Sequence, residues 1–314
     1  MRIVPREHIS ASVWDNFVER HENGWFWHTT DWLQYQCAHY PKGREESFAV
    51  LDFDGRVAAV VPLFRSPLDV SAASAFCYGI RGLLPAGLVR DAIASSRAVA
   101  HVVSEAQRAP IVTRALLEYR GTHQVGVLRG SVAFPRAVAC DVSARAVDLA
   151  SVSWSGVRES YRSLIHRAER EYVIDSVSGD VDSTSTLFSA YQKLHRDLYG
   201  DPRPEETYRL QGKWLLEGRA LVTVASDAIG TWVAAYWFIY KGEAYYGSGA
   251  YAVRNVSHAV VWRSLLVLRD LGATRAVLGY VGDVYTEKER AVEFFKRGFG
   301  GADEPVKRVS VEFA

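Results

Sequence analysis

Lys296 lies among aromatic residues near the C-terminal end of the 314-residue chain, in the segment FFKRGFGG at positions 294–301. An ammonium group held beside aromatic rings and partly out of water can stabilise negative charge on a reacting oxygen more strongly than it would in water. The alternative is a lysine that extends from an amphipathic helix and keeps its charged end in solvent. Residue type and position alone leave both interpretations open.

A row of cations is the second pattern that suggests chemistry. Four cationic or titratable side chains recur at every fourth position and would share one face of a helix: Arg158, Arg162, His166 and Arg170. Like charges in such a row repel one another unless an anion binds, so the row could contact phosphates. The alternative is a solvated helix face.

Several familiar catalytic patterns do not occur in the sequence. It has no Gly-x-Ser-x-Gly, its nine histidines show neither His-x-His nor His-Glu-x-x-His spacing, and its three cysteines lie far apart. His195 with Asp197, or Asp283, could form an acid/base pair, but no supporting motif surrounds them. We therefore expect neither a side-chain nucleophile nor a metal site.

Local patterns predict the helices that would carry these residues. A capping box precedes Lys296 and is formed by Thr286 with Glu289. An apolar stripe follows the capping box and extends past Lys296, through Val292, Phe295 and Phe299. We expect this stripe to be buried and Gly298 to end the helix in the left-handed conformation. The cationic row has an apolar stripe of its own, formed by Val157, Tyr161, Leu164, Ile165, Ala168 and Tyr172.

Two hairpin-like segments, Phe48–Phe64 and Leu221–Tyr240, indicate two related halves. Each has helical segments before and after it, at Asp31–His39, Asp91–Gln107, Ser185–Tyr199, Glu205–Glu217 and Ser257–Leu271. The chain is also long enough for two domains. We predict two α/β halves, 1–145 and 146–314, each with a mixed, largely antiparallel sheet flanked by helices, and a cleft between them.

Composition restricts the compartment and the partners. Hydrophobic residues make up 48% of the chain, but no apolar run is long enough to span a bilayer, and the first eight residues lack the apolar region of a secretory signal. Together with the scattered cysteines, this favours a cytoplasmic protein. The net charge of +1 excludes a protein that holds nucleic acid mainly through bulk charge.

The segments 158–173, 243–255 and 294–301, together with the helix that contains Gly272, resemble the Fem-type aminoacyltransferases, a family with two tandem GNAT-like acyltransferase domains. The first half is similar more loosely, through positions 25–36 and 77–87. The resemblance implies transfer of an amino acid from aminoacyl-tRNA, as co-substrate and without a cofactor, to an amine of a peptide-like acceptor. That acceptor would be a peptidoglycan precursor or a peptide or nucleoside antibiotic.

The resemblance also implies site residues. It places the Phe-Lys pair of the family on Phe295 and Lys296, and its Tyr-Gly-Ala-Ser strand on Tyr246–Gly249, with Tyr246 orienting the substrate. Residues that bind substrate or tRNA fall on Tyr78, Arg81, Arg158, Arg162, Arg170, Arg203 and Tyr208. Two departures indicate a divergent member: LGYVGD (278–283) replaces the usual strand end, and His258 stands near the position of a usual proline.

Two other functions remain open at this point. A GNAT enzyme that uses acyl-CoA needs a glycine-containing loop at a helix N-terminus to bind pyrophosphate, and the corresponding segment, Tyr251–His258, has no glycine. A tRNA- or peptide-binding module without activity is the second alternative, against which the Phe295–Lys296 pair argues.

Overall fold

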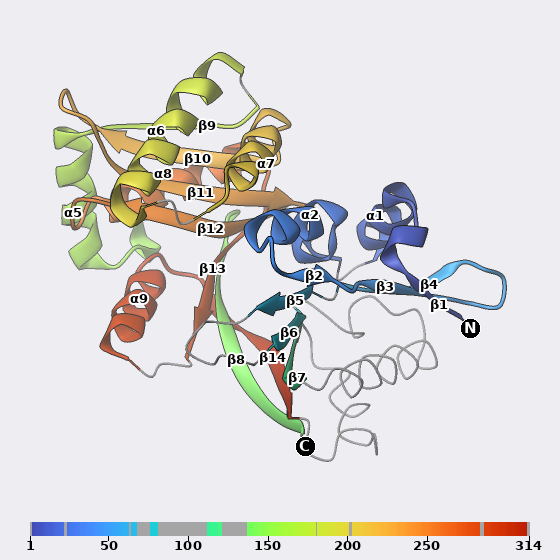
Figure 1. The fold of residues 1–314 in the computed structure, drawn as a ribbon. Helices are drawn as coiled ribbons and strands as arrows, with labels where there is room; N and C mark the ends of the chain where they lie inside the picture. Colours follow the sequence, from blue (N-terminus) through green and yellow to red (C-terminus); the bar gives the residue numbers. More distant parts are fainter. Residues whose placement is uncertain are drawn as a thin grey trace. The chain divides into compact units, whose positions relative to one another are not determined.

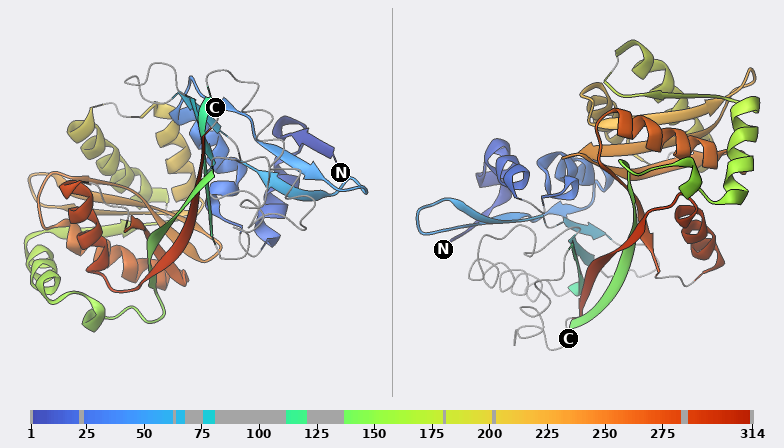
Figure 2. Two further views of the ribbon diagram at one scale, coloured as in Figure 1. Left: turned by 90° about the horizontal axis from the view of Figure 1, so that it is seen from below. Right: turned by 180° about the vertical axis from the view of Figure 1, so that it is seen from behind.

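The computed structural model describes residues 2–21, 24–62, 64–67, 76–80, 112–120, 137–179, 181–200, 203–282 and 286–312. The chain divides into two compact units, which contain Met1–Val142 with Pro305–Ala314, and Ser143–Glu304. The sequence prediction placed the division between residues 145 and 146 and assigned the whole of 146–314 to the second half. Figures 1 and 2 show the elements of each unit.

Unit 1 combines antiparallel and parallel strand pairs. An antiparallel sheet has the order β1 (Arg2–Pro5), β3 (Phe48–Leu51), β4 (Val57–Val61). A second run of strands has the order β2 (Arg44–Glu45), β5 (Phe64–Pro67), β6 (Phe76–Ile80), β7 (Val112–Arg120), β14 (Ala302–Glu312), with β6 and β7 parallel. The described helices of this unit are α1 (Ala11–Arg20) and α2 (Thr30–His39), with 3-10 turns η1 (Arg6–His8) and η2 (Phe26–His28).

The turn between β3 and β4 confirms the first predicted hairpin. The Asp52 carboxylate accepts hydrogen bonds from the backbone N–H groups of Asp54 and Arg56, at 3.0 and 2.8 Å. Gly55 has a φ of 77°, which favours glycine at this position of the turn. The helix predicted over Asp91–Gln107 lies outside the described residues.

Unit 2 is built on a mixed sheet. The strands follow the order β8 (Ala137–Asp148), β13 (Arg275–Val281), β12 (Glu243–Tyr251), β11 (Thr231–Tyr240), β10 (Ala220–Ser226), β9 (Val173–Val177), where β8 enters the unit at Ser143. All neighbouring pairs are antiparallel except β12 with β13. The helices are α5 (Glu159–Glu171), α6 (Val181–Tyr199), α7 (Glu205–Leu216), α8 (Ser257–Asp270) and α9 (Glu287–Arg297), with a 3-10 turn η3 (Trp154–Gly156). The mixed, mainly antiparallel sheet with flanking helices is the predicted fold class.

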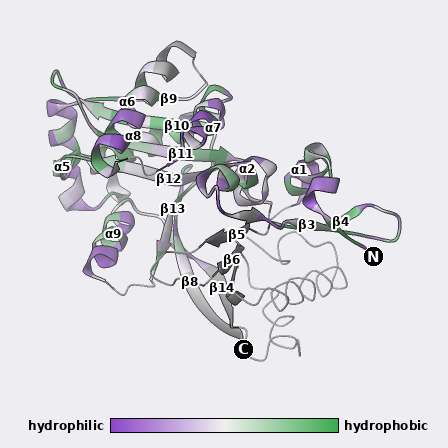
Figure 3. Ribbon diagram, viewed as in Figure 1, coloured by the Kyte–Doolittle hydropathy of each residue, from purple (hydrophilic) through white to green (hydrophobic). Residues whose placement is uncertain are grey.

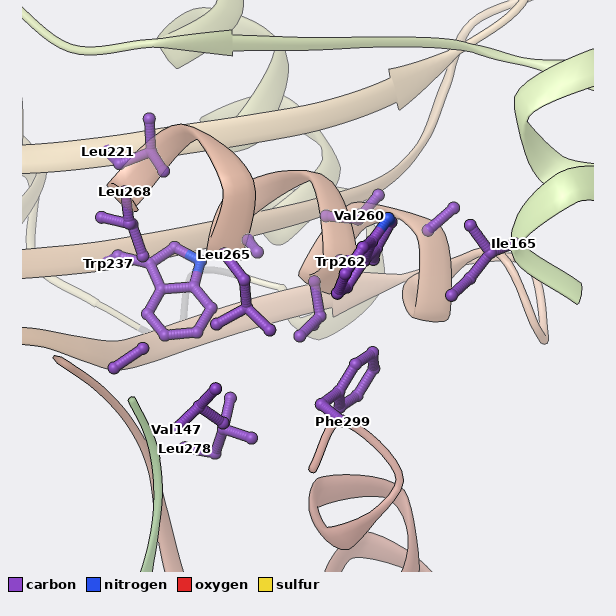
Figure 4. Packing of buried hydrophobic residues seen from close by; sticks show 14 of the residues in the cluster. Val147, Ile165, Leu221, Trp237, Val260, Trp262, Leu265, Leu268, Leu278 and Phe299 are labelled. Carbon is purple, nitrogen blue, oxygen red and sulfur yellow. The ribbon is translucent and has the colours of Figure 1, made fainter. Parts of the chain in front are cut away.

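Different helices cover the two faces of this sheet (Figures 1 and 2). Successive strand residues point to opposite faces, and β11 shows the consequence. The Tyr236 hydroxyl donates to the Gln211 carbonyl of α7 at 2.9 Å. The next residue, Trp237, belongs to a buried cluster with residues of α8 and α5, as seen from close by in Figure 4. One face is therefore covered by α6 and α7, and the other by α8 and α5.

Hydropathy follows this layering. Figure 3 shows β10 and β11 as mainly hydrophobic strands, whereas α5 and α9 carry many hydrophilic residues. The predicted apolar stripe of α5 is confirmed at Val157, Tyr161, Ile165 and Ala168, which are all buried, whereas Leu164 and Tyr172 are partly buried. The cationic row follows this stripe one position later and so lies about 100° around the helix from it.

The helix α9 begins as predicted but ends differently. The Thr286 hydroxyl accepts a hydrogen bond from the Glu289 N–H at 3.2 Å, and the Glu289 carboxylate accepts one from the Thr286 N–H at 2.8 Å, which confirms the capping box. Burial of Val292 was predicted wrongly, because its exposed fraction is 44%. The left-handed conformation at Gly298 is also wrong, since its φ of −73° is that of an ordinary helical residue.

Candidate functional site

The parallel ladder between β12 and β13 ends while both strands continue. It joins Glu243 to Arg275 and extends only as far as Tyr245 with Val277. Beyond that pair, β12 remains bonded to β11 as far as Tyr251, and β13 remains bonded to β8 as far as Val281. Over residues 246–251 and 278–281, all of which the structure describes, the two strands form no further ladder pairs. Of the sequence-predicted residues, Lys296 and Tyr246 lie beside the strands beyond this ladder end, Lys296 at β13 and Tyr246 on β12.

Lys296 extends from α9 to the continuing part of β13. Its Nζ donates a hydrogen bond to the Tyr280 carbonyl at 2.8 Å. A Cβ atom on Gly279 would lie 3.1 Å from the same Nζ, so glycine gives the ammonium room beside the strand. A lysine that extended into solvent would leave its ammonium in water, whereas this one is bound to a strand carbonyl.

The surroundings of Lys296 change its acidity. Burial lowers the pKa of the ammonium from 10.5 to about 8, and the nearby Glu293 carboxylate opposes the shift. An ammonium group has three donors, of which the Tyr280 carbonyl uses one. Lys296 is therefore mainly a cation at neutral pH, with further N–H groups to offer and with a proton that is released more easily than that of an ordinary lysine.

Aromatic rings support the end of α9 on the α8 side of the sheet. The Phe295 ring centroid lies 5.0 Å from that of His258 and 5.1 Å from that of Phe299, and the Tyr161 ring lies 4.2 Å from that of His258. Gly298 is required here for space, because a Cβ would overlap the Tyr161 ring. This close approach explains a glycine at a position where the backbone conformation does not demand one.

His258 is neutral and fixed in orientation at the start of α8. Its Nδ1 lies 2.9 Å from the Asn255 carbonyl, which can only accept, so Nδ1 carries the proton. Burial lowers the pKa of this imidazole, the Asn255 hydrogen bond opposes the shift, and Arg158 adds to it. Sequence reasoning gave His258 no role, because its ring contacts come from α5 and α9.

Arg158 joins α5 to α9. Its Nη1 donates to the Phe294 carbonyl and to the Tyr161 hydroxyl, both at 3.0 Å, and the guanidinium lies 3.6 Å from the Phe294 ring centroid. The Tyr161 hydroxyl also donates to the Phe294 carbonyl, at 3.2 Å. Both side chains thus satisfy a carbonyl near the C-terminal end of α9, directly before the Phe295–Lys296 pair.

The other cations of the row differ in their surroundings. Arg162 donates to the carbonyls of Val157 and Ser155 at 2.9 and 2.7 Å, and therefore closes the turn that precedes α5. His166 lies 3.4 Å from Glu169. Arg170 is exposed and has no hydrogen-bond or ion-pair partner in the described part of the chain. Of the predicted row, Arg170 is the cation best placed to meet an external anion.

Tyr246 and Tyr251 lie on the continuing part of β12. The Tyr246 ring packs edge-on against Trp237, with centroids 5.0 Å apart. Its hydroxyl is buried and has no hydrogen-bond partner among the described residues. A Cβ on Gly249, between the two tyrosines, would overlap both hydroxyl oxygens. The sequence prediction included Tyr246 but not Tyr251, because residues 246 and 251 of a regular strand would point to opposite faces and only the bulge in this ladder brings them to the same one.

Arg203 and Tyr208 belong to a separate polar cluster on the face covered by α6 and α7. Arg203 Nη1 donates to the Tyr191 hydroxyl at 3.4 Å, and this hydroxyl lies 2.6 Å from the Ser248 hydroxyl on β12. Tyr208 is fully buried, with its hydroxyl 3.1 Å from Nδ1 of His195. Burial and the nearby Arg203 lower the pKa of His195 to about 4, so it is neutral. Tyr208 thus joins α7 to α6.

Two predicted residues belong to unit 1. Tyr78 lies in β6, but its side chain is outside the described part of the structure, and Arg81 lies outside the described residues. No group of three or more metal-binding side chains occurs among the described residues. In the same part of the chain, no helix is both long and apolar enough to cross a membrane.

Comparison with solved structures identifies the fold. The match with FemX covers 98% of this chain and 97% of the FemX chain at 14% identity, with a TM-score of 0.62. The match with L-PGS from Bacillus licheniformis covers 96% of this chain and 91% of the L-PGS chain at 13% identity, with a TM-score of 0.61. A tandem GNAT protein from the clavulanic acid biosynthesis pathway covers 98% and 97% at 14% identity, with a TM-score of 0.58. No protein-family model and no curated protein sequence matches the chain. The chain therefore has a divergent, Fem-like tandem GNAT fold, as the sequence resemblance predicted.

Proposed function

We propose that the protein transfers an aminoacyl group from a charged tRNA to a primary amine of a peptide-like acceptor and forms a peptide bond. The observation that carries this proposal is the Lys296 ammonium, held at the end of the β12–β13 ladder with a pKa lowered to about 8. The Fem-like fold and the resemblance of the terminal motif to the Fem-type family support it.

An aminoacyl ester needs no side-chain nucleophile, because it is already activated. The acceptor nitrogen attacks the ester carbonyl carbon, a C–N bond forms, and the carbonyl oxygen takes up negative charge. The C–O bond to ribose then breaks, and the proton lost by the amine passes to the ribose oxygen. What the protein must supply is alignment together with a cation or donor near the oxygens that become charged, which are the carbonyl oxygen and the leaving ribose oxygen. Lys296 can serve either oxygen with N–H groups that Tyr280 does not use.

The other residues have supporting roles in this proposal. Phe295 packs among aromatic rings and fixes the part of α9 that carries Lys296, and Tyr246 orients the substrate. Arg170 and Arg203 would hold phosphates of the tRNA end or acceptor by bidentate contacts. Tyr78 and Arg81 are kept as proposed binding residues on the strength of the resemblance. No cofactor takes part, and the acceptor is a natural-product peptide in preference to a cell-wall precursor.

An acyl-CoA-dependent N-acyltransferase is the second candidate. One structural neighbour, the tandem GNAT protein, was solved without AcCoA. Against this candidate, the segment before α8 has no glycine, and its left-handed residue is Asn255, with a φ of 71°. A module that binds without catalysing is the third candidate.

The decisive experiment compares donors side by side. The purified protein is incubated with amine acceptors and either radiolabelled aminoacyl-tRNAs or labelled acyl-CoAs, with and without ribonuclease. We expect transfer only from aminoacyl-tRNA, and complete loss of it after ribonuclease treatment. Transfer that survives ribonuclease and requires acyl-CoA would replace the proposal by the second candidate.

A further inference from the structure

Two tyrosine hydroxyls flank one position on β12. The register places three β12 residues on the face of the sheet that α8 covers, because their partners on β11 belong to the core cluster of that face. The pairs are Tyr246 with Trp237, Gly249 with Ala235, and Tyr251 with Val233. A Cβ on Gly249 would overlap both tyrosine oxygens. The missing side chain at Gly249 therefore lets both tyrosine oxygens lie close to one point above the β12 backbone.

These hydroxyls are not used by the fold. The Tyr246 hydroxyl is buried without a hydrogen-bond partner among the described residues, whereas Tyr251 is partly exposed, at 38%. The Tyr246 ring is held edge-on against Trp237, so its hydroxyl does not turn out into water freely. Buried polar groups in native proteins are nearly always bonded, and an exception calls for an explanation such as a catalytic role.

We infer that Tyr246 and Tyr251 form a two-donor site for the carbonyl oxygen of the acyl donor, and that the missing side chain at Gly249 lets the two hydroxyls converge. Phenol hydroxyls remain protonated at neutral pH and can donate. Both donors are in position before the oxygen becomes charged, and such preorganisation is what stabilises a developing oxyanion. The inference rests on the proposed acyl transfer and names the oxygen that this part of the site binds.

The assignment gives residues at β12 and at β13 different roles in the reaction. When the acceptor nitrogen attacks, the π-electron pair of the carbonyl moves to its oxygen, which then accepts hydrogen bonds from both tyrosines on β12. When the intermediate collapses, that pair re-forms the carbonyl and the bond to the leaving oxygen breaks. Lys296, bound at β13, is then the donor for the leaving oxygen, which takes the proton released by the amine.

The test uses variants that remove only an oxygen atom. Tyr246→Phe, Tyr251→Phe and the double variant keep both rings, and Tyr172→Phe is the matched control, since Tyr172 packs against the same core cluster. The probes are two pairs of donor analogues, derived from aminoacyl-adenosine and from acyl-CoA. In each pair one member has a planar amide at the reacting centre, and the other has a tetrahedral phosphonate whose charged oxygen occupies the place of the oxyanion.

We expect the phosphonate derived from aminoacyl-adenosine to bind each single variant at least tenfold more weakly than wild type, as measured by calorimetry. Binding of the planar analogue should change by less than about twofold, because the tyrosines act on the charged oxygen. Tyr172→Phe should bind both probes like wild type. Turnover in Tyr246→Phe should fall by roughly 10²-fold, in kcat more than in KM.

Each other outcome has a clear meaning. Equal losses for planar and tetrahedral probes, or no loss for the tetrahedral one, would overturn the two-donor site while leaving aminoacyl transfer intact. The same selective loss seen only with the acyl-CoA phosphonate would keep the two-donor site and refute the tRNA donor. A wild-type protein that binds neither phosphonate more tightly than its planar partner would also overturn the site.

Discussion

Lys296 differs from a surface lysine in two ways that matter for catalysis. It is bound to the Tyr280 carbonyl at 2.8 Å, and burial lowers its pKa to about 8. A fixed cation in a partly dry site costs little reorganisation when negative charge develops nearby. The helix itself does not need this cation, because an apolar unbranched side chain would have a similar helix propensity.

Replacement of Lys296 by Met should therefore separate activity from folding. We expect turnover to fall by roughly 10²–10³-fold, mainly in kcat, because the lost interaction strengthens in the transition state. Lys296→Arg should recover little, since a planar guanidinium does not reproduce the geometry of an ammonium. Steady-state kinetics with circular dichroism as the folding control would measure this. A folded Met variant within about threefold of wild-type turnover would return Lys296 to a structural role.

The pH dependence tests the same residue with a defined sign. Because the cation is the active form, wild-type kcat should decline as pH rises through about 8, and the Met variant should lack this decline. Between pH 8 and 10.5 the unfolded chain binds the proton that folded Lys296 releases, so this residue makes stability rise with pH in that window. At neutral pH the melting temperature of the Met variant should consequently be no lower than that of wild type. As the pH rises toward 10.5, the melting temperature of wild type should increase relative to that of the Met variant.

At the scale of elements, the junction of α5 with α9 decides where Lys296 stands. Arg158 and Tyr161 both bond the Phe294 carbonyl, and the Arg158 backbone N–H donates to the Gly298 carbonyl at 2.8 Å. The absence of a side chain at Gly298 lets the Tyr161 ring approach the chain closely. Arg158 thus contributes to the site by positioning α9.

Gly298→Ala should loosen this junction. The added methyl overlaps the Tyr161 ring, which is itself packed against His258, so we expect a destabilisation of about 1–3 kcal/mol. Faster hydrogen exchange of the α5 and α9 amides, together with lower kcat, would show it. Gly156→Ala is the control, since its Cβ would meet only the Ser153 hydroxyl at 3.7 Å. Equal exchange in both variants would contradict the packing argument.

At the scale of the whole molecule, a net charge of +1 gives no general attraction for RNA. Under the proposed function, tRNA would then be bound by local cations, and the exposed Arg170 on α5 is a candidate without competing partners in the described chain. Each phosphate contact contributes about one to the slope of log K against log salt concentration.

Arg170→Glu should raise the KM for charged tRNA and reduce the salt slope by about one. The control is Lys193→Glu. Lys193 lies on α6, which covers the opposite face of the unit 2 sheet, and it pairs with the exposed Asp197. Kinetics at several salt concentrations would measure both. Identical slopes in wild type and the Arg170 variant would assign the cationic row of α5 to a solvated helix face.

The sequence by itself determined what depends on neighbours along the chain. The capping box of α9, the apolar stripe of α5 and the hairpin at Asp54-Gly55 follow from local spacing, and the structure confirms each. The terminal motif was also enough to indicate the Fem-like fold. These features can be predicted from the sequence because caps, turns and helical periodicity involve residues only a few positions apart.

Tertiary structure alone decided which residues meet. It buries Phe299 but leaves Val292 of the same stripe exposed. It also places Arg158, whose contact with phosphate stays a prediction, where it joins α5 to α9. It also brings Tyr246 and Tyr251 together over Gly249 through a bulge between β11 and β12. Such contacts depend on strand register and on the packing of elements distant in sequence, and no local pattern encodes either.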